Sequence, residues 1–238
     1  MRLALSTTAL DRTLASGEMT QLELLDVCAG ELRCDGVVLD VAHFPRRDTE
    51  YVAQVKKFAA DLALTIVGVR DDALTTQPSE ALILAAHLGA PYVLTRMPDA
   101  GNEPVLRYNE ALGLVAHAVA EAKRLNVTLA VRNVAGSLAA DGFELGRLRK
   151  EADSAWLCFA LDVVALRAAP DAKLRKHLVL AYAAGEDPGA EAVLRNLAPF
   201  AGFVCLDRTA SSGEPELDAV RRLVRHWRRS ACAVYVPE

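Results

Sequence analysis

Charged side chains end six short apolar segments of the sequence, and they are of two kinds. Three are arginines and three are aspartates, in the chain order Asp40, Arg70, Arg96, Arg132, Asp162 and Asp207. Guanidinium groups present forked donors that suit phosphate and carboxylate ligands. His43, Arg46 and Arg47, which follow the segment ending at Asp40, add cationic groups. If these segments are neighbouring strands, the residues at their ends predict a site for a small anion.

A second interpretation of the same residues needs no ligand. Equal numbers of arginines and aspartates can pair with one another and fill the site as an ion-pair network. Buried ion pairs often add little net stability. Such a network would then be kept because it specifies one conformation, or because it was inherited. The cations of the loop after Asp40 would then be solvated. Both interpretations stay open.

The segment that positions Arg132 is the clearest strand in the sequence. Residues 127–133 alternate bulky Val127, Leu129 and Val131 with smaller or polar side chains, and they follow a helical run that Asn126 breaks. In a barrel strand surrounded by helices, the bulky set faces the helices and the other set faces the interior. This parity predicts that Arg132 lies inside, at the carboxyl end of its strand.

The whole chain repeats this strand and helix pattern eight times. Strands are expected at residues 2–6, 37–40, 64–69, 91–95, 127–133, 156–161, 178–183 and 203–206. Helices are expected at about residues 20–33, 49–62, 79–88, 109–125, 143–152, 170–176, 189–197 and 214–229. Such alternation in 238 residues favours one α/β domain spanning residues 1–238, a (β/α)8 TIM barrel.

The last part of the chain admits a second register. In it, residues 206–220 would hold strand seven with its loop, and residues 231–238 would form strand eight, ending at Glu238. The first register is favoured, because the second leaves strand eight without a covering helix. The tail from Ala231 to Glu238 then looks like an extra short strand, which an eight-fold count does not accommodate.

Composition narrows the function classes. The net charge of −4 gives no overall basic surface for nucleic acid, and no segment is apolar for long enough to span a membrane. Neither a GxGxxG motif nor a Walker lysine loop follows a strand, which lowers the case for a nucleotide cofactor. The first ten residues are too short an apolar run for a secretory signal. Five scattered cysteines favour buried free thiols in a reducing cytoplasm.

Several segments, in this order and spacing, resemble the xylose isomerase-like TIM barrels, a group that includes sugar and sugar-phosphate isomerases and epimerases and the endonuclease IV branch. The likeness spans nearly the whole chain and rests on RLALSTTAL, CDGVVLDV, AHLGAPYVLTR, LNVTLAVRN, FALDVVA and GFVCLD. The resemblance implies a divalent metal at the mouth, held by a Glu ending strand five, an Asp ending strand six, a His on strand seven and a Glu ending strand eight.

This chain departs from that ligand pattern. Arg132 stands at the strand-five Glu position, Ala165 at the His of the DxxH pattern, and Arg96 at a His that commonly ends strand four. Asp162 is kept, and Asp207 takes the strand-eight position. An arginine in place of an acid changes the local charge by two, as removal of a dication would require. We therefore expect no metal and no other cofactor, with Arg132 supplying the charge of the metal.

Three functions follow from the resemblance. The first is a metal-independent relative of the sugar isomerases and epimerases that binds a small anionic molecule such as a sugar phosphate. Arg70, Arg96, Arg132, Asp40 and His43 would bind that ligand. If the protein is an enzyme, Asp162 or Asp207 would be the base, and the arginines would stabilise an enediolate. The second is a non-catalytic barrel with a salt-bridged mouth, acting as a binding or partner protein. The third is a metal-dependent isomerase. A homo-oligomer is compatible with each.

Overall fold

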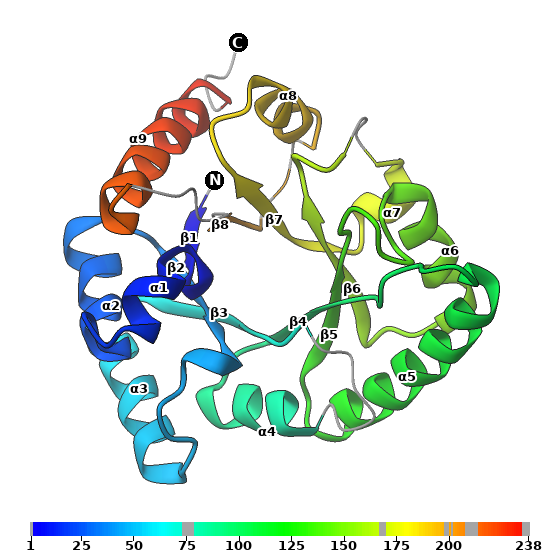
Figure 1. The fold of residues 1–238 in the computed structure, drawn as a ribbon, viewed down its shortest axis with the longest axis horizontal. Coiled ribbons are helices and arrows are strands. Elements are labelled where there is room, and N and C mark those ends of the chain that lie inside the picture. Colours follow the sequence, from blue (N-terminus) through cyan, green and yellow to red (C-terminus); the bar gives the residue numbers. More distant parts are fainter. Residues whose placement is uncertain are drawn as a thin grey trace.

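Eight parallel strands close into a barrel in the computed structural model, which describes residues 2–72, 79–166, 170–197, 200, 202–207 and 214–234. Neighbouring strands follow chain order, and the last strand pairs with the first (Figure 1). The strands are β1 Arg2–Ser6, β2 Gly36–Asp40, β3 Thr65–Arg70, β4 Tyr92–Arg96, β5 Thr128–Arg132, β6 Leu157–Asp162, β7 Leu178–Ala184 and β8 Phe203–Asp207. The predicted (β/α)8 barrel is confirmed.

Helices surround the strands and fill the connections between them (Figure 1). The α-helices are α1 Asp11–Ala15, α2 Gln21–Asp26, α3 Thr49–Asp61, α4 Ser79–Leu88, α5 Pro104–Arg124, α6 Gly142–Ala152, α7 Ala172–Arg175, α8 Pro188–Asn196 and α9 Glu216–Val234. Short 3-10 turns follow two strands, η1 Thr7–Leu10 and η3 Val41–His43, and α2 continues into a π-helical turn, η2 Val27–Glu31. Thr20 and Glu23 form the capping box that their spacing predicts.

The strands separate two apolar layers. Val127, Leu129 and Val131 pack in the outer layer, between strands and helices, whereas Ala130 lies in the inner layer that fills the barrel. The predicted parity of β5 is therefore confirmed. Tyr182 and Phe203 are the largest side chains of the inner layer. Because this layer is apolar, the charged residues at the strand ends lie above a dry interior.

Two expectations for the end of the chain need correction. The tail is not an extra strand where the structure describes it, because α9 continues to Val234. Residues 231–234 include alanines, which favour a helix, and they extend the helix that Leu223 and Trp227 anchor in the core. Residues 235–238, with Glu238, lie outside the described part. The second register is wrong, because residues 203–207 pair with both β7 and β1 as β8.

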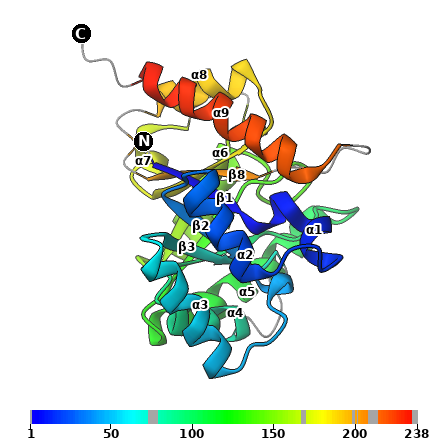
Figure 2. The same cartoon turned by 90° about the vertical axis from the view of Figure 1, so that its left-hand side faces the viewer.

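The side view in Figure 2 shows α9 and α8 on the same side of the barrel, far from α3 and α4.

No helix of the described residues is long and apolar enough to cross a membrane. Cys28, Cys34, Cys158 and Cys205 are buried and free, as expected, and burial raises the pKa of each of these thiols. The side chain of Cys232 lies outside the described part.

Candidate functional site at the barrel mouth

The carboxyl ends of the strands bring the predicted charged residues to one mouth of the barrel. The last residues of β2, β3, β4, β5, β6 and β8 are Asp40, Arg70, Arg96, Arg132, Asp162 and Asp207. Strand register sets Asp40 beside Arg70 and Arg96 beside Arg132. Parallel strands therefore convert a scattered sequence pattern into one charged layer.

Two arginines and two aspartates form the centre of this layer. Asp207 Oδ2 accepts a hydrogen bond from Arg70 Nη1 at 3.0 Å and one from Arg132 Nη1 at 3.3 Å. Asp72 Oδ2 is shared in the same way, at 2.6 Å from Arg70 Nη2 and 3.3 Å from Arg132 Nη2. The side chains of Arg70 and Arg132 are only 12% and 10% exposed, so these contacts are formed largely out of water. Of the two strand-end acids considered as partners of Arg132, Asp162 and Asp207, the structure pairs it with Asp207.

A residue of the turn after β1 also contacts this centre. The Thr8 hydroxyl donates to Asp207 Oδ1 at 2.7 Å and accepts from Arg70 Nη1 at 2.8 Å. Arg132 also lies over the ring of Tyr182, with 4.8 Å between its guanidinium carbon and the ring centroid. The two guanidiniums are thus held in fixed positions by a hydroxyl, an aromatic ring and shared carboxylates.

The charges within the centre stabilise one another. Burial opposes the charged form of Arg70, but Asp72 and Asp207 raise the pKa of its guanidinium above the ordinary value. Burial likewise acts to raise the pKa of Asp72, but the hydrogen bond and charge of Arg70 and the charge of Arg132 bring it below the ordinary value. Asp72 is therefore a carboxylate at neutral pH, and its side chain is 36% exposed.

Asp162 lies beside this centre in a different environment. Its Oδ1 accepts from the backbone N–H groups of Val164 and Ala165 at 3.1 and 3.3 Å. The buried Asn133 side chain holds the Asp162 backbone, accepting from its N–H at 2.7 Å and donating to its carbonyl at 3.3 Å. Burial raises the pKa of the Asp162 carboxyl, against these hydrogen bonds and the charge of Arg132. Asp162 is therefore a predicted base whose pKa is raised by its surroundings.

Asp40 and His43 occupy the other side of the mouth. Asp40 Oδ1 accepts from the backbone N–H of Ala42 at 2.9 Å, and its Oδ2 lies 3.7 Å from Arg70 Nε. Burial raises the pKa of Asp40 as it does that of Asp162. His43 lies between Thr7 Oγ1 and Asp11 Oδ1, at 2.8 Å from each. The ring of His43 is thus hydrogen-bonded to residues of η1 and α1.

Arg96 does not join the centre. It pairs with Asp99 in the loop that follows β4, and its side chain is more exposed than those of Arg70 and Arg132. Its charge still contributes to lowering the pKa of Asp72. The expected convergence of three arginines therefore holds for two of them, because a local acid redirects the third.

Sequence reasoning did not identify Asp72, Thr8 or Tyr182. Asp72 lies two residues beyond the end of β3, and Thr8 lies two residues beyond the end of β1. One signal was available, because polar residues just past the strand ends lie on the loops that line the mouth of such a barrel. Tyr182 occupies an inward position of β7, which the alternation of that strand could have indicated.

Sequence comparison gives no match to a known family model and none to a curated protein, so similarity is seen at the level of structure. The probable 3-DHS dehydratase AsbF of Bacillus anthracis superposes with a TM-score of 0.77 at 14% identity, over 94% of this chain and 98% of that one. A xylose isomerase domain containing protein of Salmonella typhimurium LT2 gives a TM-score of 0.72 at 14% identity, over 99% and 97%. This chain therefore has the same TIM-barrel fold as these proteins. The E. coli 3-keto-D-glucoside 4-epimerase YcjR shares it, with a TM-score of 0.72 at 14% identity, over 97% of this chain and 99% of that one.

The divalent metal that the xylose isomerase-like fold implies does not suit the residues of this mouth. Among the described residues, no group of three or more His, Cys, Asp or Glu side chains could hold a metal ion. The strand-eight acid, Asp207, already contacts two guanidiniums. Their positive charges would repel a metal ion that bound to the same carboxylate. A dication prefers several carboxylate or imidazole ligands, and an arginine stands at the strand-five position.

Proposed function

We propose that this xylose isomerase-like barrel is metal-independent and binds a small anionic carbohydrate-like molecule at its mouth. Arg70 and Arg132 would bind the anionic group, as a phosphate or carboxylate, through their forked donors. Structural neighbours named as a 3-keto-D-glucoside epimerase and a probable 3-DHS dehydratase support a ligand of this class by analogy of fold alone.

The observation that carries the proposal is the position of Asp72. A single carboxylate oxygen of Asp72 is shared between the two buried guanidiniums, while its side chain remains partly exposed. A carboxylate or phosphate oxygen of a ligand could make the same two contacts. Asp72 would then act as an internal anion that an incoming ligand replaces.

Two buried polar groups support a polar ligand at the same place. Among the described residues, neither the Tyr182 hydroxyl nor Arg70 Nε has a hydrogen-bond partner, although both are buried. Unsatisfied buried groups of this kind are rare and commonly mark a site for water or a ligand. A sugar hydroxyl can accept from Arg70 Nε, and it can donate to or accept from the Tyr182 hydroxyl.

If the ligand is transformed, Asp162 is the stronger candidate for proton transfer. Asp207 accepts from Thr8, Arg70 and Arg132, and these donors occupy its lone pairs. The raised pKa of Asp162 brings its carboxyl closer to the range in which an acid or base works well near neutral pH. Asp40 shares this property on the opposite side of the barrel.

A non-catalytic barrel is the second candidate. The observation that favours it is that each arginine at a strand end has an acid partner, because Arg70 and Arg132 share Asp72 and Asp207 and Arg96 pairs with Asp99. A mouth that is neutralised in this way could be a stable ion-pair plug that takes no ligand.

Calorimetric titration with inorganic phosphate and several hexose phosphates at low ionic strength separates the two candidates. In Asp72→Asn, binding should tighten about tenfold, because a competing charge worth about 1.4 kcal/mol is removed. Arg132→Lys keeps the charge but loses the fork, and it should weaken binding. Asp61→Asn, at the exposed end of α3, makes the same charge change as Asp72→Asn away from the mouth and should leave binding unchanged.

The plugged barrel is the better account if neither the parent nor Asp72→Asn binds any of these anions at millimolar concentration. If Asp61→Asn tightens binding as much as Asp72→Asn does, the effect comes from overall charge and the assignment of the anion site to the mouth fails.

A further inference from the structure

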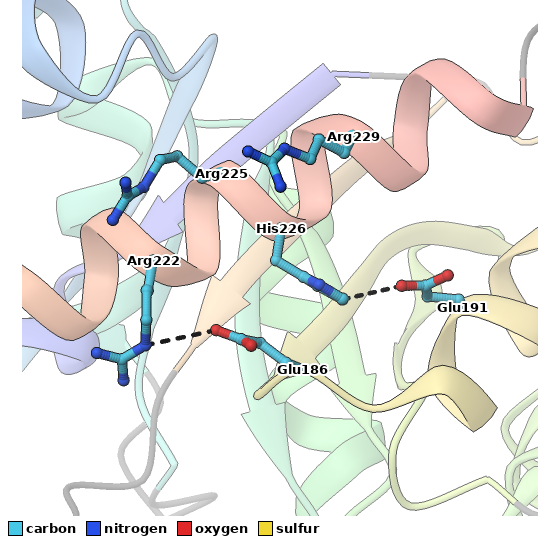
Figure 3. A pocket seen from close by; sticks show the side chains of 6 residues that line it. All are labelled: Glu186, Glu191, Arg222, Arg225, His226 and Arg229. Atoms are coloured by element: carbon cyan, nitrogen blue, oxygen red, sulfur yellow. Dashed lines mark ion pairs between the residues drawn. The ribbon is translucent and has the colours of Figure 1, made fainter.

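A second charged site lies outside the barrel, between α8 and α9. A hollow of about 400 Å³ lies there, on the flank of α9 and open to solvent. Figure 3 shows the side chains that line it. It is lined by Glu186, Glu191, Arg222, Arg225, His226 and Arg229. The four α9 residues follow the spacing i, i+3, i+4 and i+7, which places them on one face of the helix. The volume is in the range of sites that take small organic ligands.

The acids of this hollow already have partners. Glu191 contacts His226 Nε2 at 2.9 Å and Arg195 at 3.2 Å. Glu186 lies 3.6 Å from Arg222 Nε, and Arg222 is also paired with Glu214. The negative charge of the lining is therefore engaged by neighbouring cations.

Two arginines of the same face are left without an acid. Within the described part of the chain, neither Arg225 nor Arg229 forms an ion pair, and Figure 3 draws ion pairs to Arg222 and His226 alone among the α9 side chains. Arg225 Nε donates to the carbonyl of Arg221 at 3.3 Å, which leaves both terminal nitrogens available. Arg225 and Arg229 are i and i+4 neighbours, so their guanidiniums can reach the same ligand.

The helix that carries these arginines is firmly seated. Val220, Leu223, Val224 and Trp227 form the buried stripe of α9. The Trp227 indole also donates to the carbonyl of Gly185 at 3.0 Å, which ties α9 to the loop that holds Glu186. The hollow therefore lies between α9 and the loop of Glu186, which are held together. A basic helix without such packing would not hold its arginines at a fixed distance from that loop.

We propose that Arg225 and Arg229 bind the phosphate group of a small metabolite in this hollow, with Arg222 at its edge. Two guanidiniums can bind a phosphate through several N–H donors. The bound anion also offsets the repulsion between the two neighbouring positive charges. The engaged acids on the other wall would limit the site to ligands whose remaining part is neutral or a hydrogen-bond donor. This site is separate from the mouth and does not depend on the function proposed for it.

The proposal is tested by titrating the protein with inorganic phosphate and pyrophosphate, with NMR of the His226 ring as a local readout and calorimetry for affinity. Saturable binding is expected, with a shift of the His226 resonances. Arg225→Gln and Arg229→Gln should each weaken it at least tenfold. Arg221→Gln removes the same charge from the same helix outside the hollow, and it should change affinity less than twofold. Arg132→Lys, at the mouth, should leave this site intact.

Three outcomes would overturn the site. One is the absence of saturable binding to either anion. Another is an equal loss in Arg221→Gln and Arg225→Gln, which would indicate diffuse attraction to a basic helix. The third is a single-stranded oligonucleotide that competes more strongly as it lengthens, since that would identify the face as a polyanion surface.

Discussion

The arginines of the barrel mouth and those of helix α9 are the same residue type in two environments. Arg70 and Arg132 are buried, and they share Asp72, in the loop after β3, and Asp207, at the end of β8. On α9, Arg221 pairs with Asp218 three residues away and with Glu31, all near solvent. Water already satisfies an exposed guanidinium, so an exposed pair adds little, whereas a buried charge that loses its partner is strongly destabilising.

The two regions also differ in whether one acid contacts two arginines. Asp207 contacts both arginines of the mouth as well as the Thr8 hydroxyl, so removal of one member changes the surroundings of all the others. Groups in one network have effects on stability that do not add. On α9, Arg221 contacts Asp218 and Glu31 on an exposed surface, and substitutions of these residues should act nearly independently.

The largest effect is expected for Arg132→Glu, which restores the acid that the family resemblance places at this position. The variant leaves Asp72 and Asp207 facing a third carboxylate, and it should lower the free energy of unfolding by roughly 3–5 kcal/mol, as for a broken buried pair. Denaturant unfolding in the presence of a chelator measures this loss. A variant as stable as the parent in chelator would refute the idea that Arg132 supplies the charge of a metal.

The same idea predicts the metal content of the parent protein. Elemental analysis after purification should find no stoichiometric zinc, manganese or magnesium, because Arg132 stands where the resemblance requires a carboxylate. Chelator should then leave the unfolding midpoint of the parent unchanged. Near-stoichiometric metal that is lost in Asp162→Ala would establish the metal-dependent alternative instead.

A smaller loss is expected for Thr8→Val, which keeps the shape of the side chain and removes its hydroxyl. That hydroxyl lies between Arg70 and Asp207, and its loss leaves both with one hydrogen bond fewer. The expected cost is about 1–3 kcal/mol, typical of a partly buried hydrogen bond to charged groups. Ser16→Ala, which removes an exposed hydroxyl that donates to the carbonyl of Thr13 at 3.2 Å, is the control and should cost less. Equal losses would mean that burial does not set the difference between the two regions.

The fold was predictable because strand parity and alternation depend on local sequence. Residues 127–133 displayed both faces of β5, and this placed Arg132 inside the barrel before any contact was known. The partners of the arginines were less predictable, since they depend on loop geometry. Asp72 and Asp99 lie in loops beyond β3 and β4, and their positions decide that Arg70 stays in the centre while Arg96 leaves it.

The end of the chain shows the limit of short patterns. Residues 231–236 alternate in a way that also suits a strand, and only the continuation of the α9 stripe through Trp227 assigns residues 231–234 to the helix. Tertiary packing therefore decided a segment whose local preference was ambiguous.

Asp162→Asn tests the other type of buried acid in the mouth, through its dependence on pH. The folded-state pKa of Asp162 is raised, so between its ordinary value and the raised value the folded protein binds more protons than the unfolded chain. Stability due to this group is lost as pH rises through that window. Asparagine keeps the oxygen that accepts from Val164 and Ala165 and carries no charge. The variant should be more stable than the parent at neutral pH and equal to it near pH 4, about the ordinary pKa of an aspartate.

Asp72→Asn should show the opposite dependence, because the pKa of Asp72 is lowered by Arg70 and Arg132 despite burial. Its carboxylate stabilises the fold above the ordinary pKa and loses that contribution as pH falls through the lowered value. Urea unfolding of both variants from neutral pH to well below pH 4, where the contribution of Asp72 is lost, gives the two signs in one experiment. If both differences are independent of pH, the charge states assigned to the mouth are wrong.

The smallest effect is expected at Arg221, where the comparison between regions is sharpest. Arg221→Gln breaks two ion pairs, to Asp218 and Glu31, as many acidic partners as Arg132 has. Because all three of these side chains are largely solvated, water replaces the lost contacts, and denaturant unfolding should detect no change in the free energy of unfolding. Arg132→Gln, measured in the same way, should be clearly destabilised, and added salt should not alter that difference much, since buried pairs are poorly screened. If the two glutamine variants lose the same stability, the number of ion pairs would govern these arginines, and burial would not.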